Sequence, residues 1–190
     1  GNGNDFTPNG FTPDSVVADT PSNNYCVMNP LNHFGSVSSS YGNLIGSAQK
    51  DAEIRASIPV PNHGKWYWEG QFVSGSSSDA QFGIVDPTTQ PGYASNQSVV
   101  FSADSGDIWN YSGRASYGQS WRNDYVACAV DMDNHSIRFY VNGVAQPDLT
   151  IGGYPATNFF VSMCSDNGGG GSLKFNFGQR SWTHEPPEGY

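Results

Sequence analysis

The stretch NDYVACAVDMDNHSIRFYVNG, residues 123–143, shows the fold of this chain most clearly. In its first half the larger apolar side chains alternate with alanine and fall on one face: Val126, Cys128 and Val130, followed by Met132. Residues 136–141 alternate in the same way, with Ile137, Phe139 and Val141 on one face. A period of two residues is typical of half-buried strands, so this stretch predicts two paired β-strands.

Turn residues bound these two strands. Asp131-Met132-Asp133-Asn134 joins them and Asn142-Gly143 ends the second, and Asn, Asp and Gly readily adopt the positive φ of hairpin turns. Asp131 and Asp133 could together hold Ca²⁺, but an EF-hand loop needs further acidic residues and a closing Glu, which do not follow. We therefore predict turns without a metal, and calcium at Asp131 and Asp133 is the alternative.

The composition suits one all-β domain. The 190 residues include 23 Gly and 12 Pro, as expected for a chain with many turns. Aromatic residues make up 14%, which is enough bulky side chains for a core although only 36% of residues are hydrophobic. The net charge of −9 would repel a phosphate backbone, so we predict no nucleic-acid partner. No apolar run approaches the ~18 residues of a membrane span, so we predict no membrane insertion.

Further strands are predicted after residue 64. The alternating or apolar runs, each free of proline, are GKWYWEGQFV (64–73), DAQFGIVD (79–86), NFFVSMCSD (158–166) and GSLKFNFGQ (171–179). The segment SDNGGGGS, residues 165–172, is predicted to be a long hairpin loop between the last two strands. Regular strands without intervening helices favour an all-β, two-sheet antiparallel β-sandwich.

Residues 1–60 are less regular. Their prolines and few apolar side chains argue against a helix or an independent core, so we predict an N-terminal arm that adds edge strands to the same domain. The sandwich itself is predicted to span residues 61–190. Within the arm we expect short strands near Val16–Val17 and Tyr25–Met28, and a strand at residues 51–58. The chain begins GNGNDF without Met, so we expect a processed or excised part of something longer.

Patterns that would indicate catalysis or a metal are not found. The sequence contains no HExxH, no GxSxG and no E-x-D-x-x-E, the last being typical of concanavalin-like β-glucanases. A Ser-His-Asp triad is not excluded by sequence, because its members need not be neighbours. We predict no enzyme activity, no cofactor and no metal. The three cysteines have no CxxC spacing and are predicted to be free, with Cys128 and Cys164 buried.

Five motifs together resemble a SPRY (B30.2-like) domain. They are GKWYWE (64–69), FGIVD (82–86), GDIWNY (106–111), residues 116–143 and LKFNFGQRSWTHEPPEGY (173–190). Two positions depart from the family pattern, since Asn123 and Ala127 stand where glycines are usual, and YVNG replaces a lysine form of the hairpin. The resemblance covers residues 64–190 and implies a SPRY or concanavalin-like jelly roll that binds partners and is not catalytic.

The first third has a second resemblance. NDFTPNGFTPDSVVADTPSNNYCVMNPL, residues 4–31, is similar to the segment before SPRY-type domains in large tailed-phage virion proteins. This resemblance implies a module of a virion appendage, located on the particle surface, that binds a host-surface glycan or protein. The alternative is a structural or decoration module that binds neighbouring virion subunits, and a glycan-degrading enzyme is the least favoured hypothesis.

The candidate ligand contacts lie in the two loops that are richest in aromatic residues, 86–97 and 102–121. Aromatic rings there could stack on a sugar or anchor a peptide. The candidates are Tyr93, Asn96, Trp109, Tyr111 and Arg114. Trp109, together with Tyr117 and Trp121, could instead serve packing, because SPRY-like sequences also tend to have aromatic residues there.

Overall fold

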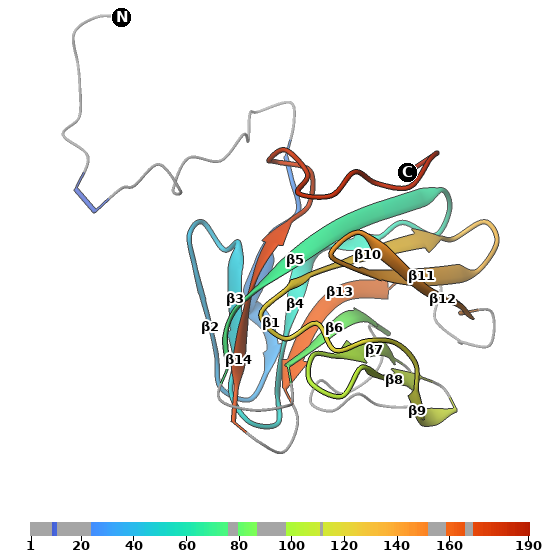
Figure 1. Ribbon diagram of the computed structural model, residues 1–190. Helices are drawn as coiled ribbons and strands as arrows, with labels where there is room; N and C mark the ends of the chain where they lie inside the picture. The colour runs from blue at the N-terminus through green and yellow to red at the C-terminus, as the bar shows by residue number, and fades with distance from the viewer. Residues whose placement is uncertain are drawn as a thin grey trace, which may run out of the picture.

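The computed structural model describes residues 9–10, 24–75, 80–86, 98–110, 112–151, 159–165 and 169–190. In these residues the chain forms fourteen β-strands and no helix. The strands make two antiparallel sheets of seven strands each, packed face to face (Figure 1). The predicted all-β, two-sheet sandwich is therefore confirmed.

The first sheet contains seven strands in the spatial order β1-β4-β13-β6-β7-β8-β9. Their bounds are Met28–Phe34 for β1, Ala52–Val60 for β4, Phe159–Ser165 for β13, Ala80–Val85 for β6, Ser98–Ser102 for β7, Asp107–Asn110 for β8 and Gly113–Ser116 for β9. Strand β13 comes from the predicted run of residues 158–166, and it is an inner strand that lies between β4 and β6.

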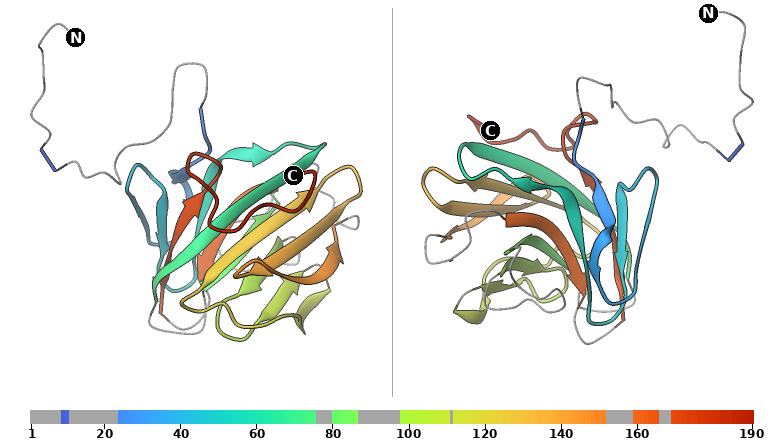
Figure 2. Two further views of the ribbon diagram at one scale, coloured as in Figure 1. Left: turned by 45° about the horizontal axis from the view of Figure 1, so that its top comes forward. Right: turned by 180° about the vertical axis from the view of Figure 1, so that it is seen from behind.

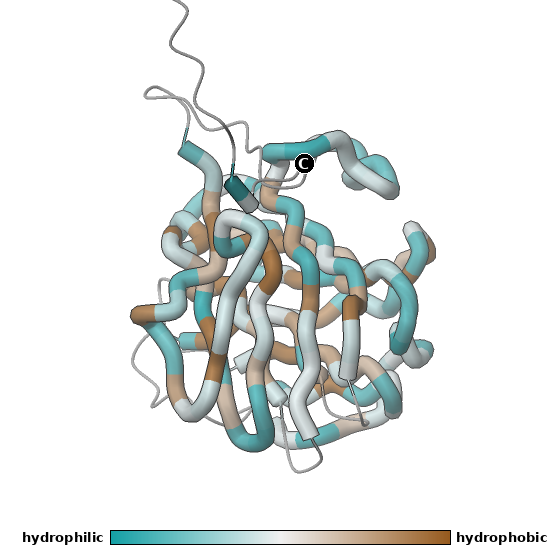
Figure 3. The backbone as a smooth tube through the Cα atoms, turned by 90° about the vertical axis from the view of Figure 1, so that its left-hand side faces the viewer, coloured by the Kyte–Doolittle hydropathy of each residue, from teal (hydrophilic) through white to brown (hydrophobic). Residues whose placement is uncertain are grey.

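The second sheet has the order β12-β11-β10-β5-β14-β3-β2. Its strands are Val144–Thr150 for β12, Ser136–Val141 for β11, Tyr125–Asp131 for β10, Lys65–Gly75 for β5, Gly171–Asn176 for β14, Ile45–Ala48 for β3 and Val37–Ser40 for β2. Figure 3 views the molecule from the β2 side and shows hydrophobic and hydrophilic residues interspersed along the strands.

The hairpin of residues 123–143 forms as predicted. In β10 and β11, Cys128 lies opposite Phe139 and Val130 opposite Ile137. The Oδ1 atom of Asp131 accepts hydrogen bonds from the backbone N–H groups of Asp133 and Asn134, at 3.1 and 2.9 Å. These contacts close the turn, and the side-chain amide of Asn134 also donates to Asp131, at 2.8 Å. The predicted turn chemistry is thus confirmed.

The turn that ends β11 also has the predicted backbone geometry. Asn142 and Gly143 have φ of +49° and +78° and lead directly into β12. Within the described residues, no group of three or more His, Cys, Asp or Glu side chains is arranged to hold a metal ion. The Asp131 carboxylate accepts the hydrogen bonds that close the first turn. These bonds, most of all the one from the Asn134 side chain, lower the pKa of Asp131.

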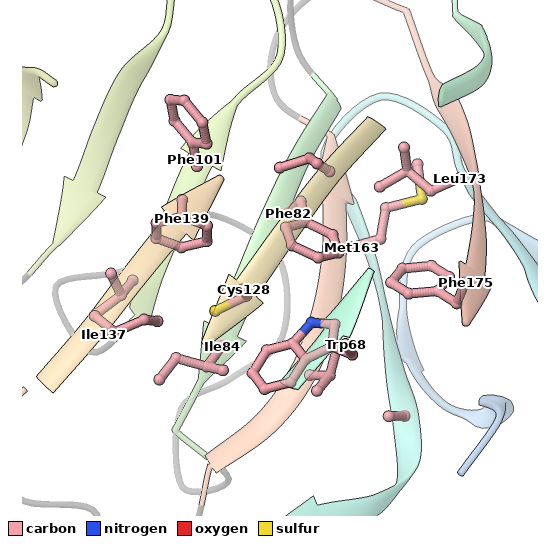
Figure 4. Close-up of a cluster of buried hydrophobic side chains, with 14 of the residues drawn as sticks. Trp68, Phe82, Ile84, Phe101, Cys128, Ile137, Phe139, Met163, Leu173 and Phe175 are labelled. Atoms are coloured by element: carbon pink, nitrogen blue, oxygen red, sulfur yellow. The ribbon is translucent and has the colours of Figure 1, made fainter. Parts of the chain in front are cut away.

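The core fills the space between the sheets and centres on Phe82 of β6 (Figure 4). The Phe82 ring stacks on Phe175 of β14 with centroids 5.9 Å apart and meets Phe139 of β11 edge-on at 6.3 Å. Trp121, which follows β9, is also fully buried against Phe82. Burying each such ring stabilises the fold by roughly 1.5–3 kcal/mol, so these rings hold the two sheets together.

Four of the strands lie between residues 28 and 60, two in each sheet. Residues 51–58 were expected to be a strand, and this is confirmed by β4. The expected strand at Tyr25–Met28 is wrong in its position, because strand β1 begins only at Met28. The N–H of Val27 is turned to the Ser57 hydroxyl, at 3.1 Å, and so does not join the ladder. The expected strand near Val16–Val17 lies outside the described part, and the division at residue 60 stays a prediction.

The glycine-rich segment at residues 165–172 does not connect a hairpin. The strand before it, β13, belongs to the first sheet, and the strand after it, β14, belongs to the second. The segment therefore crosses between the sheets, and the prediction of a hairpin loop is wrong. Gly171 lies where the sheets approach each other, since a Cβ atom there would come within 2.9 Å of the Ala80 Cβ.

All three cysteines are free thiols, as predicted. Cys128 lies in the main core, and Cys164 lies on the other face of the first sheet. Burial raises the pKa of the Cys128 thiol well above its ordinary value. Cys26 is only partly buried.

Candidate recognition surface

The β8–β9 hairpin forms one end of the first sheet. Its strands pair Asp107 with Ser116 and Trp109 with Arg114. Successive side chains of a strand point to opposite faces, so Asp107 and Trp109 share the face that Arg114 also occupies. Figure 1 shows the hairpin at the lower right, away from the C-terminus.

Three side chains on this face make a polar and aromatic cluster, which we call the β8–β9 cluster: Asp107, Trp109 and Arg114. The Arg114 Nε atom donates a hydrogen bond to the Asp107 carboxylate at 2.7 Å. The guanidinium lies over the Trp109 ring, 5.5 Å from its centroid. The Arg114 side chain is nevertheless 53% exposed, so its remaining N–H groups face solvent in a defined position.

Trp109 packs against a small apolar cluster on the outer face of the first sheet. This cluster consists of Val85, Val100 and Cys164, and Trp109 and Phe160 pack against it. Val100 lies on the opposite face of its strand from Val99 and Phe101, which are in the main core. One face of Trp109 is therefore fixed by packing, and Arg114 is stacked on a rigid support.

The structure brings two of the five predicted contact residues together, Trp109 and Arg114. They lie on the paired strands β8 and β9, so the prediction that they belong to a loop is wrong. The other three, Tyr93, Asn96 and Tyr111, lie outside the described residues. Asp107 is not among the predicted contact residues, although it completes the cluster. Its position two residues before Trp109 was the available signal, because it places both on one face of a strand. Trp121 is fully buried and Tyr117 is packed against the core.

A second surface feature is an apolar groove of about 300 Å³ at one end of the sandwich. It lies between the end of β4 and the start of β5, and the residues before β1 and after β14 complete its walls. Aromatic and aliphatic residues dominate its lining, among them Tyr25, Ile58, Trp66, Trp68 and Phe177. Ile58 and Trp66 are 45% and 40% exposed, which is high for large apolar side chains.

The C-terminal segment, residues 177–190, lies across the outer face of the second sheet (Figure 2, left). The Glu69 carboxylate of β5, which is buried, accepts hydrogen bonds from the backbone N–H of Thr183 at 2.9 Å and the Asn176 side-chain amide at 3.0 Å. The Tyr67 hydroxyl donates to the His184 carbonyl at 3.2 Å. Glu69 thus has a structural role here, fastening this segment to the sheet.

A comparison of the sequence with protein families assigns the chain to one family. The SPRY domain family matches residues 65–180, more than half of the 190 residues. This chain belongs to the SPRY domain family. SPRY domains are generally protein-interaction modules and are typically not catalytic.

Solved structures show the same fold. The SPRY domain of human HERC1 is 16% identical, with a TM-score of 0.69, over 81% of this chain and 99% of that one. A second human SPRY domain is 17% identical with a TM-score of 0.61, over 76% of this chain and 97% of that one. Stonustoxin is 12% identical with a TM-score of 0.61, over 80% of this chain but only 27% of its own length.

The described secondary-structure elements are all β-strands. In the portion of the chain that the structure describes, no helix is long and apolar enough to cross a membrane.

Proposed function

We propose that this SPRY domain is a non-catalytic recognition module of a tailed-phage virion protein, which binds a host-surface protein or glycan through its loop edge. The family supports a binding role, and the resemblance of residues 4–31 to segments of virion proteins supports the location on the particle. Loops at the end of a rigid sandwich are also where binding residues tend to gather, because they vary without disturbing the core.

The β8–β9 cluster is the observation on which this proposal rests. Two contacts fix the orientation of the Arg114 guanidinium: an ion pair with the Asp107 carboxylate and stacking on the Trp109 ring. More than half of the Arg114 side chain is nevertheless exposed. An arginine held in this way loses little side-chain entropy on binding, and it offers several donors in a fixed plane. Such a group suits the recognition of a carboxylate, a carbonyl or a hydroxyl on a partner.

The alternative is a structural or decoration module that binds a neighbouring virion subunit. The apolar groove favours it, because exposed large apolar side chains such as Ile58 and Trp66 are often found at protein interfaces. The two hypotheses therefore use different ends of the sandwich and different chemistry. A substitution at either place separates them.

The test is binding of the purified, labelled domain to intact bacterial cells and to a glycan array. We expect Arg114→Ala to weaken binding by about 1–3 kcal/mol, because a charged hydrogen-bond donor is lost from the contact surface. Arg138→Ala is the matched control, since Arg138 forms a comparable exposed ion pair with Asp148 on β11 and β12 of the other sheet. Equal effects of the two variants would contradict the proposal.

Two residues outside the described part are tested in the same assay. Tyr93→Ala and Tyr111→Ala are expected to weaken binding by roughly 1–3 kcal/mol if either ring is a central contact. We expect their melting temperatures to stay close to that of the wild type, because neither ring is expected to fill the core. A fall in melting temperature without loss of binding would assign these residues to packing instead.

A further inference from the structure

A polar niche of about 190 Å³ lies on the outer face of the second sheet, beside the C-terminal segment. Its floor is a row of three side chains from neighbouring strands. Tyr125 of β10 lies opposite Gln71 of β5, and Gln71 lies opposite Lys174 of β14. One wall is formed by the C-terminal segment through Arg180, Ser181 and Thr183. The niche is therefore built from three parts of the chain that are distant in sequence, residues 69–71, residue 125 and residues 174–183.

The position of the C-terminal wall is well defined. The buried Glu69 carboxylate holds the backbone of Thr183, and the Asn176 amide donates to the carbonyl groups of Arg180 and Ser181, both at 3.2 Å. Lys174 is also positioned, since its ammonium lies 5.9 Å from the centroid of the Tyr41 ring. The groups around the niche are thus arranged before any ligand arrives, which reduces the ordering cost of binding.

The charge of the niche differs from that of the whole chain. Its lining contains two cationic side chains, Lys174 and Arg180, and one carboxylate, Glu69, which gives a net charge of 2 − 1 = +1. The chain as a whole has a net charge of −9. The Glu69 carboxylate is 3% exposed as a residue and is occupied by hydrogen bonds from Thr183 and Asn176. An anionic group is therefore favoured on the Lys174 and Arg180 side of the niche.

The remaining lining groups narrow the ligand class. The Gln71 amide and the hydroxyls of Tyr125, Ser181 and Thr183 both donate and accept hydrogen bonds. The hydroxyl groups of a sugar ring have the same dual character, whereas an acidic amino-acid side chain only accepts. The volume is below the ~300 Å³ at which pockets for drug-sized ligands begin, so a single ring is the appropriate size.

From these observations, we propose that the niche binds one carboxylate-bearing sugar residue, such as a uronic acid. The carboxylate is held by Lys174 and Arg180, and the ring hydroxyls are matched by Gln71 and Tyr125. The site lies on a different sheet from the β8–β9 cluster, so it does not depend on the proposed function. The Arg114→Ala variant is expected to bind the sugar as the wild type does.

The test is an NMR titration of the ¹⁵N-labelled full chain with sodium D-glucuronate. D-glucose serves as the neutral control and N-acetylglutamate amide as the acidic, non-sugar control. We expect glucuronate to shift amide signals of residues 69–71, 125, 174–176 and 180–183, while glucose and the glutamate derivative shift them much less. Lys174→Gln is expected to weaken glucuronate binding by about tenfold or more, because a charge-assisted hydrogen bond is lost.

The matched control is Lys50→Gln, which makes the same change of charge on the connection between β3 and β4. Lys50 follows the end of β3 that pairs with Gly171, away from the end that pairs with Lys174. Lys50→Gln is expected to bind like the wild type. Equal binding by Lys174→Gln, or the absence of glucuronate-induced shifts at the niche, would overturn the proposal. A stronger response to the glutamate derivative than to glucuronate would overturn the sugar assignment.

Discussion

A single carboxylate organises the turn between β10 and β11. Asp131 accepts three hydrogen bonds from the next residues and lies 3.8 Å from the Lys65 ammonium. All of these contacts favour the ionised form and lower the pKa of Asp131 below that of an unfolded carboxyl. Its contribution to stability is therefore complete above the unfolded value of about 3.9, and it is lost as the pH falls through the lower folded pKa.

This linkage predicts how Asp131→Asn behaves with pH. The variant should be less stable than the wild type at about pH 7, and the difference should shrink as the pH falls below about 3.9, because the carboxyl of the unfolded chain takes up a proton there before that of the folded chain. Urea denaturation of both proteins at several pH values measures this difference in the free energy of unfolding. A difference that stays constant across this range would mean that the charge of Asp131 does not contribute.

Gly83 shows a constraint of a different kind at the centre of the first sheet. It lies on β6 opposite Val100 of β7, and a Cβ atom added to it would lie 2.0 Å from the Val99 carbonyl oxygen. That oxygen belongs to the backbone of a paired strand, so the strands would have to move apart. At Gly70 an added Cβ would meet the Phe82 ring at 3.0 Å, and a side chain adjusts more easily than a strand.

We therefore expect Gly83→Ala to lower the free energy of unfolding by roughly 1–3 kcal/mol or more, and Gly70→Ala to lower it less. Chemical denaturation of both variants measures the difference. Equal costs would show that the close approach of β6 and β7 is relieved without separating the strands.

Core positions in the alternating strands were predictable because the alternation is local. Ile137, Phe139 and Val141 were assigned to one face from their spacing alone, and all three are buried. Ile137→Ala should cost about 2–5 kcal/mol of stability through the cavity that it leaves, measured by thermal or urea denaturation. A cost near zero would mean that neighbouring side chains collapse into the space.

At the level of elements, the C-terminal segment depends on Glu69. Glu69→Gln removes the charge from the acceptor of the Thr183 N–H and Asn176 hydrogen bonds, so we expect a loss of about 1–3 kcal/mol and faster hydrogen exchange in residues 177–190. Glu185→Gln is the matched control, because Glu185 lies in the same segment and is exposed. Similar exchange in both variants would show that other contacts, such as that of Tyr67 with His184, hold the segment.

Connections between elements were harder to predict than the elements. The hairpin of residues 123–143 is specified by its own turn residues, and it was predicted correctly. The crossing at residues 165–172 depends on which sheet each flanking strand joins, and that choice is made by distant partners such as β4, β5 and β6. Trp109 and Arg114 were both candidates from the sequence, but their contact through the β8–β9 pairing, with Asp107, required the structure.

At the level of the whole molecule, the sandwich separates three surfaces. The β8–β9 cluster ends the first sheet, the apolar groove opens at one end of the sandwich, and the polar niche lies on the outer face of the second sheet. The core occupies the inner faces of both sheets, and the apolar groove reaches its residues Val60, Trp68 and Val161. The central claim is that partner recognition uses the first of them.

Hydrogen–deuterium exchange of the domain, alone and saturated with the host-surface partner isolated by the cell-binding assay, tests this claim most directly. The account predicts slower exchange on binding in residues 104–117 and little change in residues 58–61 and 66–68, which line the groove. Protection of residues 58–61 and 66–68 with unchanged exchange in residues 104–117 would contradict it.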